Sequence, residues 1–153
     1  MSDRAVTDYD SVAEAYAAGV DARPWNAHYV SSLAVHYVHD LVALFAEWAR
    51  IVRPGGNVVF STHHPFYDLK RVRRGGYTRT EIVEDSWGWL GAVRYYHRPL
   101  AALLAPLIAA GFLIERVDEP APTNALRAVD PEGHRKLTRM PGFLIVRARS
   151  VAR

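Results

Sequence analysis

The chain has 153 residues, half of them hydrophobic, and a formal net charge of +3. This length fits one domain (1–153), and this share of hydrophobic residues is enough for a core without covalent cross-links. The absence of cysteine excludes a disulfide framework, a zinc–thiolate site and a cysteine nucleophile. The longest apolar run, 100–112, is shorter than the roughly 20 residues that cross a bilayer. The N-terminus has no signal-peptide pattern, so we expect a cytoplasmic protein with no membrane partner.

The positive charge comes from arginines spread along the chain, with one tight cluster at Arg71, Arg73 and Arg74. Such a cluster is typical of a solvated loop, and no nucleic-acid-binding motif accompanies it. A basic nucleic-acid-associated protein is therefore a function that we do not expect.

The first predicted elements are a helix and a short strand. Residues 8–18 favour a helix that either Asp10 or Ser11 can cap, with Glu14 three residues after Ser11, and a loop follows to residue 29. The apolar run Leu33–Val35 predicts a short buried strand within 31–38.

A complete βαβ unit is predicted over 30–62. After the strand, Asp40 can cap a helix in which Leu41, Phe45 and Trp48 recur at helical spacing. Pro54-Gly55-Gly56 then turns the chain. Residues 57–62, Asn-Val-Val-Phe-Ser-Thr, predict a second strand.

The second half of the chain predicts shorter elements. Residues 63–98 are irregular, rich in His, Arg, Gly and Trp, and include short strands at 82–85 and 93–97. The later elements follow in order: a helix at 100–110 that Pro106 can kink, a strand at 112–117, a short helix at 131–139 and a final strand at 143–149. The last two strands are expected to pair antiparallel.

Several motifs carry a family resemblance in their order along the chain. They are Tyr9-Asp10-x-x-Ala13-x-x-Tyr16, His36-Tyr37-Val38-His39-Asp40, Arg50-Ile51-Val52-Arg53-Pro54-Gly55-Gly56, Tyr96-His97-Arg98-Pro99-Leu100, Ala109-Ala110-Gly111-Phe112 and Pro141-Gly142-Phe143-Leu144. Together they resemble the N-terminal helix and the C-terminal half of class I S-adenosylmethionine-dependent methyltransferases. The resemblance implies an α/β fold with a truncated Rossmann-like sheet and an antiparallel last strand. It also implies an N-terminal helix and loop at 8–29, a substrate-cap-like region at 63–98, and a C-terminal helix and strand pair at 99–149.

The chain departs from that family at the cofactor. The resembled enzymes hold S-adenosylmethionine on a glycine-rich loop, and this sequence contains no Gly-x-Gly. Three βα units, at least about 50 residues, are missing between the N-terminal loop and the βαβ unit. The strand at Leu33–Val35 then loses a neighbour, and an exposed apolar edge strand invites pairing, so a homodimer is predicted through it.

Two functions follow from the resemblance. The first is an S-adenosylmethionine-dependent methyltransferase that acts on a small-molecule acceptor. The second is a catalytically inactive remnant that binds a ligand or a partner.

Candidate site residues cluster after the two strands of the βαβ unit, where open α/β sheets bind ligands. His63 and His64 are candidates for positioning the acceptor or removing its proton. The alternative is that they are loop histidines with local hydrogen bonds. No carboxylate or cysteine pattern completes a metal site around them, so no metal is expected.

Aromatic residues supply the remaining candidates. The resemblance implies that Tyr16, Trp25 and His36 contact the cofactor. Trp87, Trp89 and Tyr96 lie in the substrate-cap-like region and favour a flat, apolar or aromatic acceptor. Ordinary core packing is the alternative for these side chains.

Overall fold

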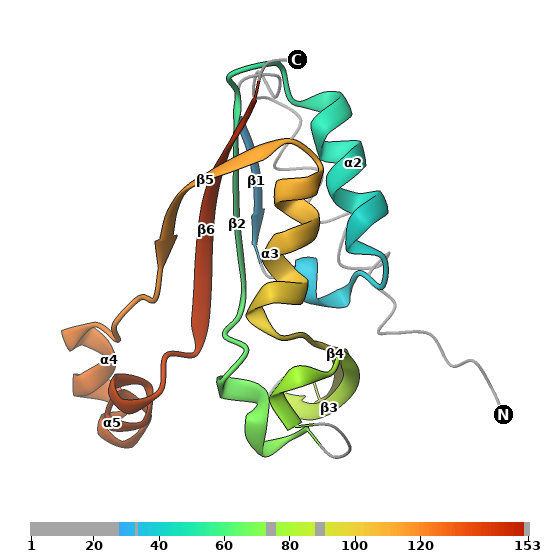
Figure 1. Ribbon diagram of the computed structural model, residues 1–153. Helices are drawn as coiled ribbons and strands as arrows, with labels where there is room; N and C mark the ends of the chain where they lie inside the picture. The colour runs from blue at the N-terminus through green and yellow to red at the C-terminus, as the bar shows by residue number, and fades with distance from the viewer. Residues whose placement is uncertain (1–27, 33, 73–75, 88–90, 152–153) are drawn as a thin grey trace, which may run out of the picture.

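The computed structural model describes residues 28–32, 34–72, 76–87 and 91–151 (Figure 1). The strands in these ranges are β1 His28–Ser32, β2 Asn57–His63, β3 Glu81–Trp87, β4 Gly91–His97, β5 Phe112–Asp118 and β6 Phe143–Ser150. The helices are α2 Leu41–Ile51, α3 Leu100–Ala109, α4 Asn124–Val129 and α5 Pro131–Arg139, with 3₁₀ turns η1 Val35–Tyr37, η2 Tyr67–Lys70 and η3 Gly76–Thr78.

The main sheet has the order β1-β2-β6-β5. β1 and β2 are parallel, with Val30 opposite Val59, whereas β6 runs antiparallel to both β2 and β5. The predicted α/β class and the antiparallel last strand are therefore confirmed.

The helix, turn and strand predicted after Asp40 are present. The Asp40 carboxylate accepts a hydrogen bond from the backbone N–H of Ala43 at 3.0 Å and so caps α2. At the Pro-Gly-Gly turn, Gly55 has a φ of 76°, a conformation that a side chain disfavours. β2 then returns parallel to β1, so α2 is the crossover of a βαβ unit.

The strand predicted at Leu33–Val35 is wrong. The strand lies earlier, at His28–Ser32, and Val35 begins the 3₁₀ turn η1, while Leu33 lies outside the described residues. Val35 is buried because η1 packs into the core, and a short apolar run does not distinguish a buried turn from a buried strand. The edge predicted for dimer pairing is therefore not formed by Leu33–Val35. Among the described residues, β1 pairs with β2 alone.

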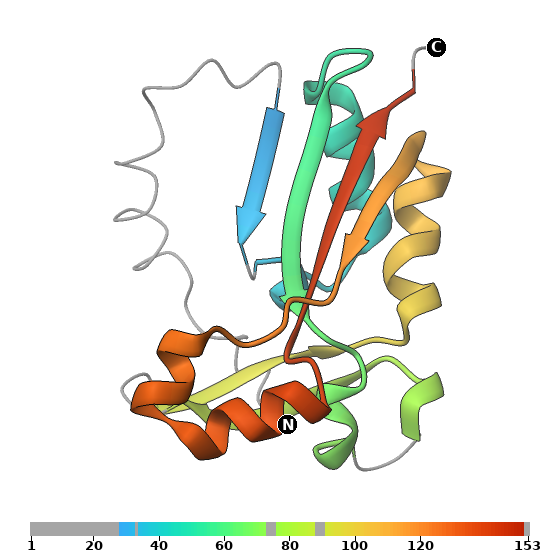
Figure 2. The same cartoon turned by 90° about the vertical axis from the view of Figure 1, so that its left-hand side faces the viewer.

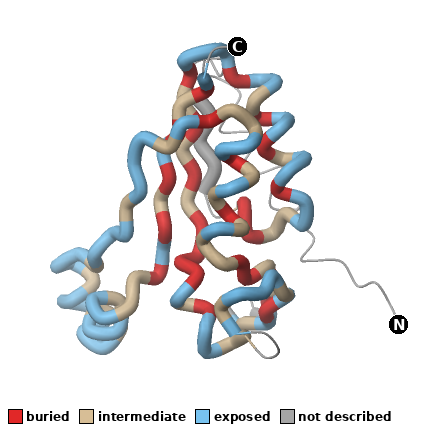
Figure 3. The backbone as a smooth tube through the Cα atoms, in the orientation of Figure 1, coloured by how far each residue is buried: buried red, intermediate tan, exposed pale blue. Residues whose placement is uncertain are grey.

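The principal core lies on one face of the sheet, where α2 and α3 pack side by side (Figures 1 and 3). Along β2, Val58 and Phe60 are fully buried and alternate with half-buried Val59 and Ser61. The core residues from these elements are Val35, Leu41, Phe45, Trp48, Val52, Val58, Phe60, Leu103, Leu107, Phe112, Leu144, Val146 and Ala148. This face holds the strands in register and so fixes where their ends lie.

A second group of elements lies beyond the carboxyl ends of β1 and β2 (Figures 1 and 2). The β3–β4 hairpin has its own small cluster of Val83, Val93 and Tyr95. Helices α4 and α5 connect β5 to β6, and of the two only α5 was predicted. The helix predicted at 8–18 lies outside the described residues. No helix in the described part of the chain is both long and apolar enough to cross a membrane.

The packing of Phe60 leads to a stability prediction. Phe60 is fully buried between α2 and the sheet, with Phe45 and Trp48 in ring contact. Phe60→Ala should lower the free energy of unfolding by about 3–5 kcal/mol because it leaves a cavity. Urea unfolding measures this change. Val42→Ala, at an exposed position of α2, is the control and should change stability by less than about 0.5 kcal/mol. Equal effects of the two substitutions would contradict this location of the core.

Candidate functional site

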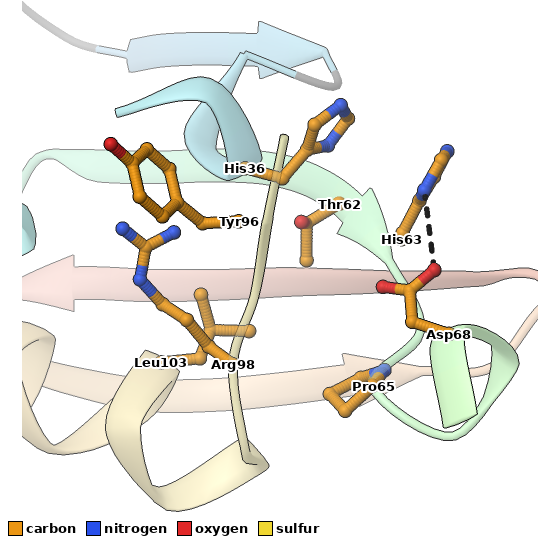
Figure 4. A pocket seen from close by; sticks show the side chains of 8 residues that line it. All are labelled: His36, Thr62, His63, Pro65, Asp68, Tyr96, Arg98 and Leu103. Atoms are coloured by element: carbon orange, nitrogen blue, oxygen red, sulfur yellow. Dashed lines mark ion pairs between the residues drawn. The ribbon is translucent and has the colours of Figure 1, made fainter. Parts of the chain in front are cut away.

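A cluster of polar side chains lies at the carboxyl ends of β1 and β2 (Figure 4). Turn η1 supplies His36, and β2 ends in His63. Turn η2 supplies Asp68, and the end of β4 brings Tyr96 and Arg98. These side chains border one small cavity of about 10 Å³, which is roughly the space for a single water molecule.

The two histidines of this cluster stack on each other. Their ring centroids are 4.6 Å apart and their planes differ by 26°. Burial, followed by the neighbouring His63 and Arg98, lowers the pKa of His36 to about 3. Burial also lowers the pKa of His63, against the opposing effect of Asp68. Both rings are therefore neutral at pH 7. Of the two, His63 has a neighbouring carboxylate, Asp68, that favours its protonated form.

Asp68 is a buried carboxylate at the centre of the cluster, only 2% exposed. One carboxylate oxygen accepts a hydrogen bond from the Tyr95 hydroxyl at 2.9 Å and lies 3.8 Å from His63 Nδ1. The other oxygen lies 3.9 Å from His97 Nδ1. Burial, together with Asp68, raises the pKa of Tyr95, which keeps this hydroxyl protonated as the donor. Asp68 thus holds groups from β2 and β4 together.

Arg98 provides the positive charge of the cluster. Its guanidinium donates hydrogen bonds to the backbone carbonyls of Val38 and His39, and it lies 4.7 Å from the centre of the Tyr96 ring. Burial lowers its pKa to about 10, so the group stays charged at neutral pH. It therefore ties β4 to the loop between η1 and α2 and fixes Tyr96 beside the cavity.

His64 makes a different set of contacts from His63. Its Nδ1 accepts a hydrogen bond from the backbone N–H of Phe66 at 3.2 Å, and its Nε2 lies 2.7 Å from the Glu119 carboxylate. Because Nδ1 is an acceptor, the proton is on Nε2, which donates to Glu119. The bond with Phe66 is local, whereas the contact with Glu119 links the ends of β2 and β5.

The structure brings together three of the predicted site residues: His36, His63 and Tyr96. Tyr16, Trp25 and Trp89 lie outside the described residues, and Trp87 ends β3 without a described side chain.

Sequence reasoning missed Asp68 and Arg98. Asp68 stands in a segment without periodicity. Tyr95, like Tyr96, lies in the region expected to cap the substrate, but no sequence pattern predicts its hydrogen bond to Asp68. Only the tertiary contacts of these side chains reveal their part in the site.

The described residues do not by themselves fit S-adenosylmethionine. The cavity at the strand ends holds about one water molecule, and the sequence has no glycine-rich loop. No group of three or more potential metal ligands converges within the described ranges.

Comparisons with known proteins show which fold the chain shares. No protein-family model matches the chain. A structure of an S-adenosylmethionine-dependent methyltransferase from Mesorhizobium loti is 36% identical, has a TM-score of 0.65, and is matched over 80% of this chain and 61% of that protein. A protein from Listeria monocytogenes assigned to the same class is 22% identical with a TM-score of 0.69, over 82% of this chain and 62% of that one.

A curated relative from Haemophilus influenzae, itself uncharacterized, is 27% identical over 138 residues. The match takes in 79% of this chain and 52% of the relative. The chain thus spans about half the length of its curated relative and about three-fifths of the two structures.

The chain therefore has the fold of class I S-adenosylmethionine-dependent methyltransferases, which confirms the resemblance found in the sequence. The match covers part of each of these proteins, so the reaction of this chain is a separate question.

The buried histidines predict a pH dependence of stability. Folded His36, with a pKa near 3, stays neutral where an unfolded histidine, with its usual pKa of 6.5, takes up a proton. The unfolded state therefore binds more protons as the pH falls from 6.5 toward 3, and the protein loses stability in this window. His36→Phe should reduce the slope by about 1.4 kcal/mol per pH unit, the effect of one proton. Urea unfolding at several pH values measures the slope.

The control for this measurement is His39→Phe, which removes an exposed imidazole three residues along the chain. A slope that is the same in His36→Phe and the unmodified protein would show that His36 is not the neutral buried group described.

Proposed function

We propose that the chain is an S-adenosylmethionine-dependent methyltransferase that binds a small-molecule acceptor at the carboxyl ends of β1 and β2. The observation that carries this proposal is the convergence of three polar or aromatic side chains, His36, His63 and Tyr96, at these strand ends. Open α/β sheets bind ligands in this position.

His63 is the residue proposed to take the acceptor's proton. Its ring is neutral because burial lowers its pKa. The proton of a hydroxyl, phenol or amine would pass to Nε2, because Nδ1 faces Asp68 at 3.8 Å. The buried Asp68 carboxylate would stabilise the imidazolium that forms. Methyl transfer depends largely on alignment of the two reactants, so one such group suffices.

The acceptor proposed for this site is flat and aromatic. Tyr96 is fixed beside the cavity by Arg98, and Trp87 and Trp89 belong to the same cap-like region. Aromatic side chains favour stacking against a planar ligand.

The cofactor contacts are proposed to come from Tyr16, Trp25 and His36, as the family resemblance implies. His64, whose nitrogens both have partners, remains the weaker candidate for acceptor positioning.

Binding of S-adenosylhomocysteine to the full chain tests the methyltransferase proposal. Isothermal titration calorimetry should show binding of one molecule per chain. Trp25→Ala should weaken it about tenfold because the loss of an aromatic contact costs about 1.4 kcal/mol. Phe66→Ala, which removes a partly exposed aromatic outside the proposed contacts, should leave the affinity within about twofold. Absence of binding by the unmodified chain would overturn the proposal.

The second candidate is a non-catalytic remnant that binds a partner through the edge of β1. The supporting observation is that β1 pairs with β2 alone among the described residues, and an unpaired strand edge can accept another strand. Nothing in the described residues supports a homodimer in particular.

Size-exclusion chromatography with light scattering tests this second candidate. If the β1 edge pairs two copies, the molar mass should rise from that of one chain, 17.2 kDa, toward twice that value as the concentration increases. A constant mass of one chain over a hundredfold range of about 1–100 μM would exclude self-association through this edge.

A further inference from the structure

A second hollow of the molecule is a groove between turn η2 and helix α5. It has a volume of about 790 Å³, within the range of small-molecule sites. Tyr67 and Lys70 line one wall, and Arg135, Lys136 and Arg139 line the other. Figure 2 shows α5 passing beside η2 beneath the main sheet.

The groove is strongly cationic. Arg71 also lines it, but Arg71 is paired with Asp85 at 2.9 Å. The four cations Lys70, Arg135, Lys136 and Arg139 make no ion pair with another residue of the described ranges. Glu132 is the one carboxylate among the described residues that line the groove. The groove therefore concentrates positive charge that has no ion-pair partner among the described residues.

This arrangement places like charges close together, and their electrostatic repulsion is unfavourable. Arg135 and Arg139 are four residues apart on α5, the spacing at which like charges on a helix repel. Lys136 and Arg71 both lie over the Tyr67 ring, 5.2 and 5.1 Å from its centre. The Tyr67 ring therefore contacts one cation at the end of η2 and one from α5. An anion in the groove would be attracted by Lys136 and by its neighbours on α5.

The groove adjoins the histidine cluster through η2. The Tyr67 ring is 6.2 Å from the His63 ring, and Asp68, the next residue, belongs to the cluster. A small molecule that reaches both sites would place its anionic group in the groove and its reacting atom near His63.

We infer that this groove binds the anionic group, a phosphate or a carboxylate, of a small-molecule ligand. Its identification as the methyl acceptor rests on the proposed function, whereas anion binding itself does not. A bounded groove with cations gathered on one aromatic ring favours a compact anion over an extended nucleic-acid backbone.

The experiment is an isothermal calorimetric titration of the full chain with inorganic pyrophosphate and, separately, with citrate. Arg135→Gln/Arg139→Gln should weaken the binding of the preferred anion at least about tenfold, the loss expected for one charge-assisted hydrogen bond. The control Arg53→Gln/Arg116→Gln removes the same charge at exposed positions outside the groove and should stay within about twofold. Higher salt should weaken binding to the unmodified protein.

Three results would overturn the inference. One is that neither anion binds the unmodified protein. Another is that both double variants lose affinity equally, which would mean diffuse attraction to net charge. The third is that a single-stranded oligonucleotide binds far more tightly than either anion and loses affinity in Arg135→Gln/Arg139→Gln alone, which would make the groove a nucleic-acid surface.

The same titrations separate this inference from the methyltransferase proposal. Anion binding in the groove without binding of S-adenosylhomocysteine contradicts the methyltransferase proposal and supports the groove. Binding of S-adenosylhomocysteine without binding of either anion supports the methyltransferase proposal and contradicts the inference about the groove.

A change in helix stability alone would not explain the expected loss. Lys136 and Arg139 lie in the last turn of α5, where cations favour the helix dipole. If the cations of α5 only stabilised the helix, Arg135→Gln/Arg139→Gln would lower the thermal stability of the chain and leave its affinity for pyrophosphate and citrate unchanged. That result contradicts an anion site.

Discussion

The parallel pairing of β1 with β2 is the constraint on which the candidate site depends. Two parallel strands end at the same edge of a sheet, and α2 is the crossover that makes the pairing parallel. The chain leaves β1 toward η1, so His36 lies beside the end of β2, where His63 stands. The core formed by α2, α3 and one face of the sheet fixes the positions of these strand ends.

The site is formed by polar side chains that are buried away from water. Burying imidazoles, a carboxylate and a guanidinium is unfavourable unless they contact one another. Here Asp68 accepts the Tyr95 hydroxyl and faces two histidines, while Arg98 donates to two backbone carbonyls. The same burial keeps His36 and His63 neutral, and only the Asp68 carboxylate beside His63 favours a protonated ring.

The chain matches part of a methyltransferase fold. It spans about three-fifths of the two structures it matches, and its described residues enclose a cavity of one water molecule where a cofactor site would be larger. What it retains around the strand ends is a histidine cluster with an adjoining cationic groove. These two features are the proposed binding site for the acceptor and for its anionic group.

The sequence by itself determined the elements that depend on local pattern. The spacing of Leu41, Phe45 and Trp48, the cap at Asp40 and the turn at Gly55 specify a helix, its start and a reversal, because each acts over a few residues. The tertiary structure alone decided that Val35 belongs to a buried turn instead of a strand. A short apolar run in the sequence is the same whether its residues are buried in a turn or in a strand. The tertiary structure also decided that Asp68, Tyr95 and Arg98 join His63, because they meet across distances of many residues that no periodicity encodes.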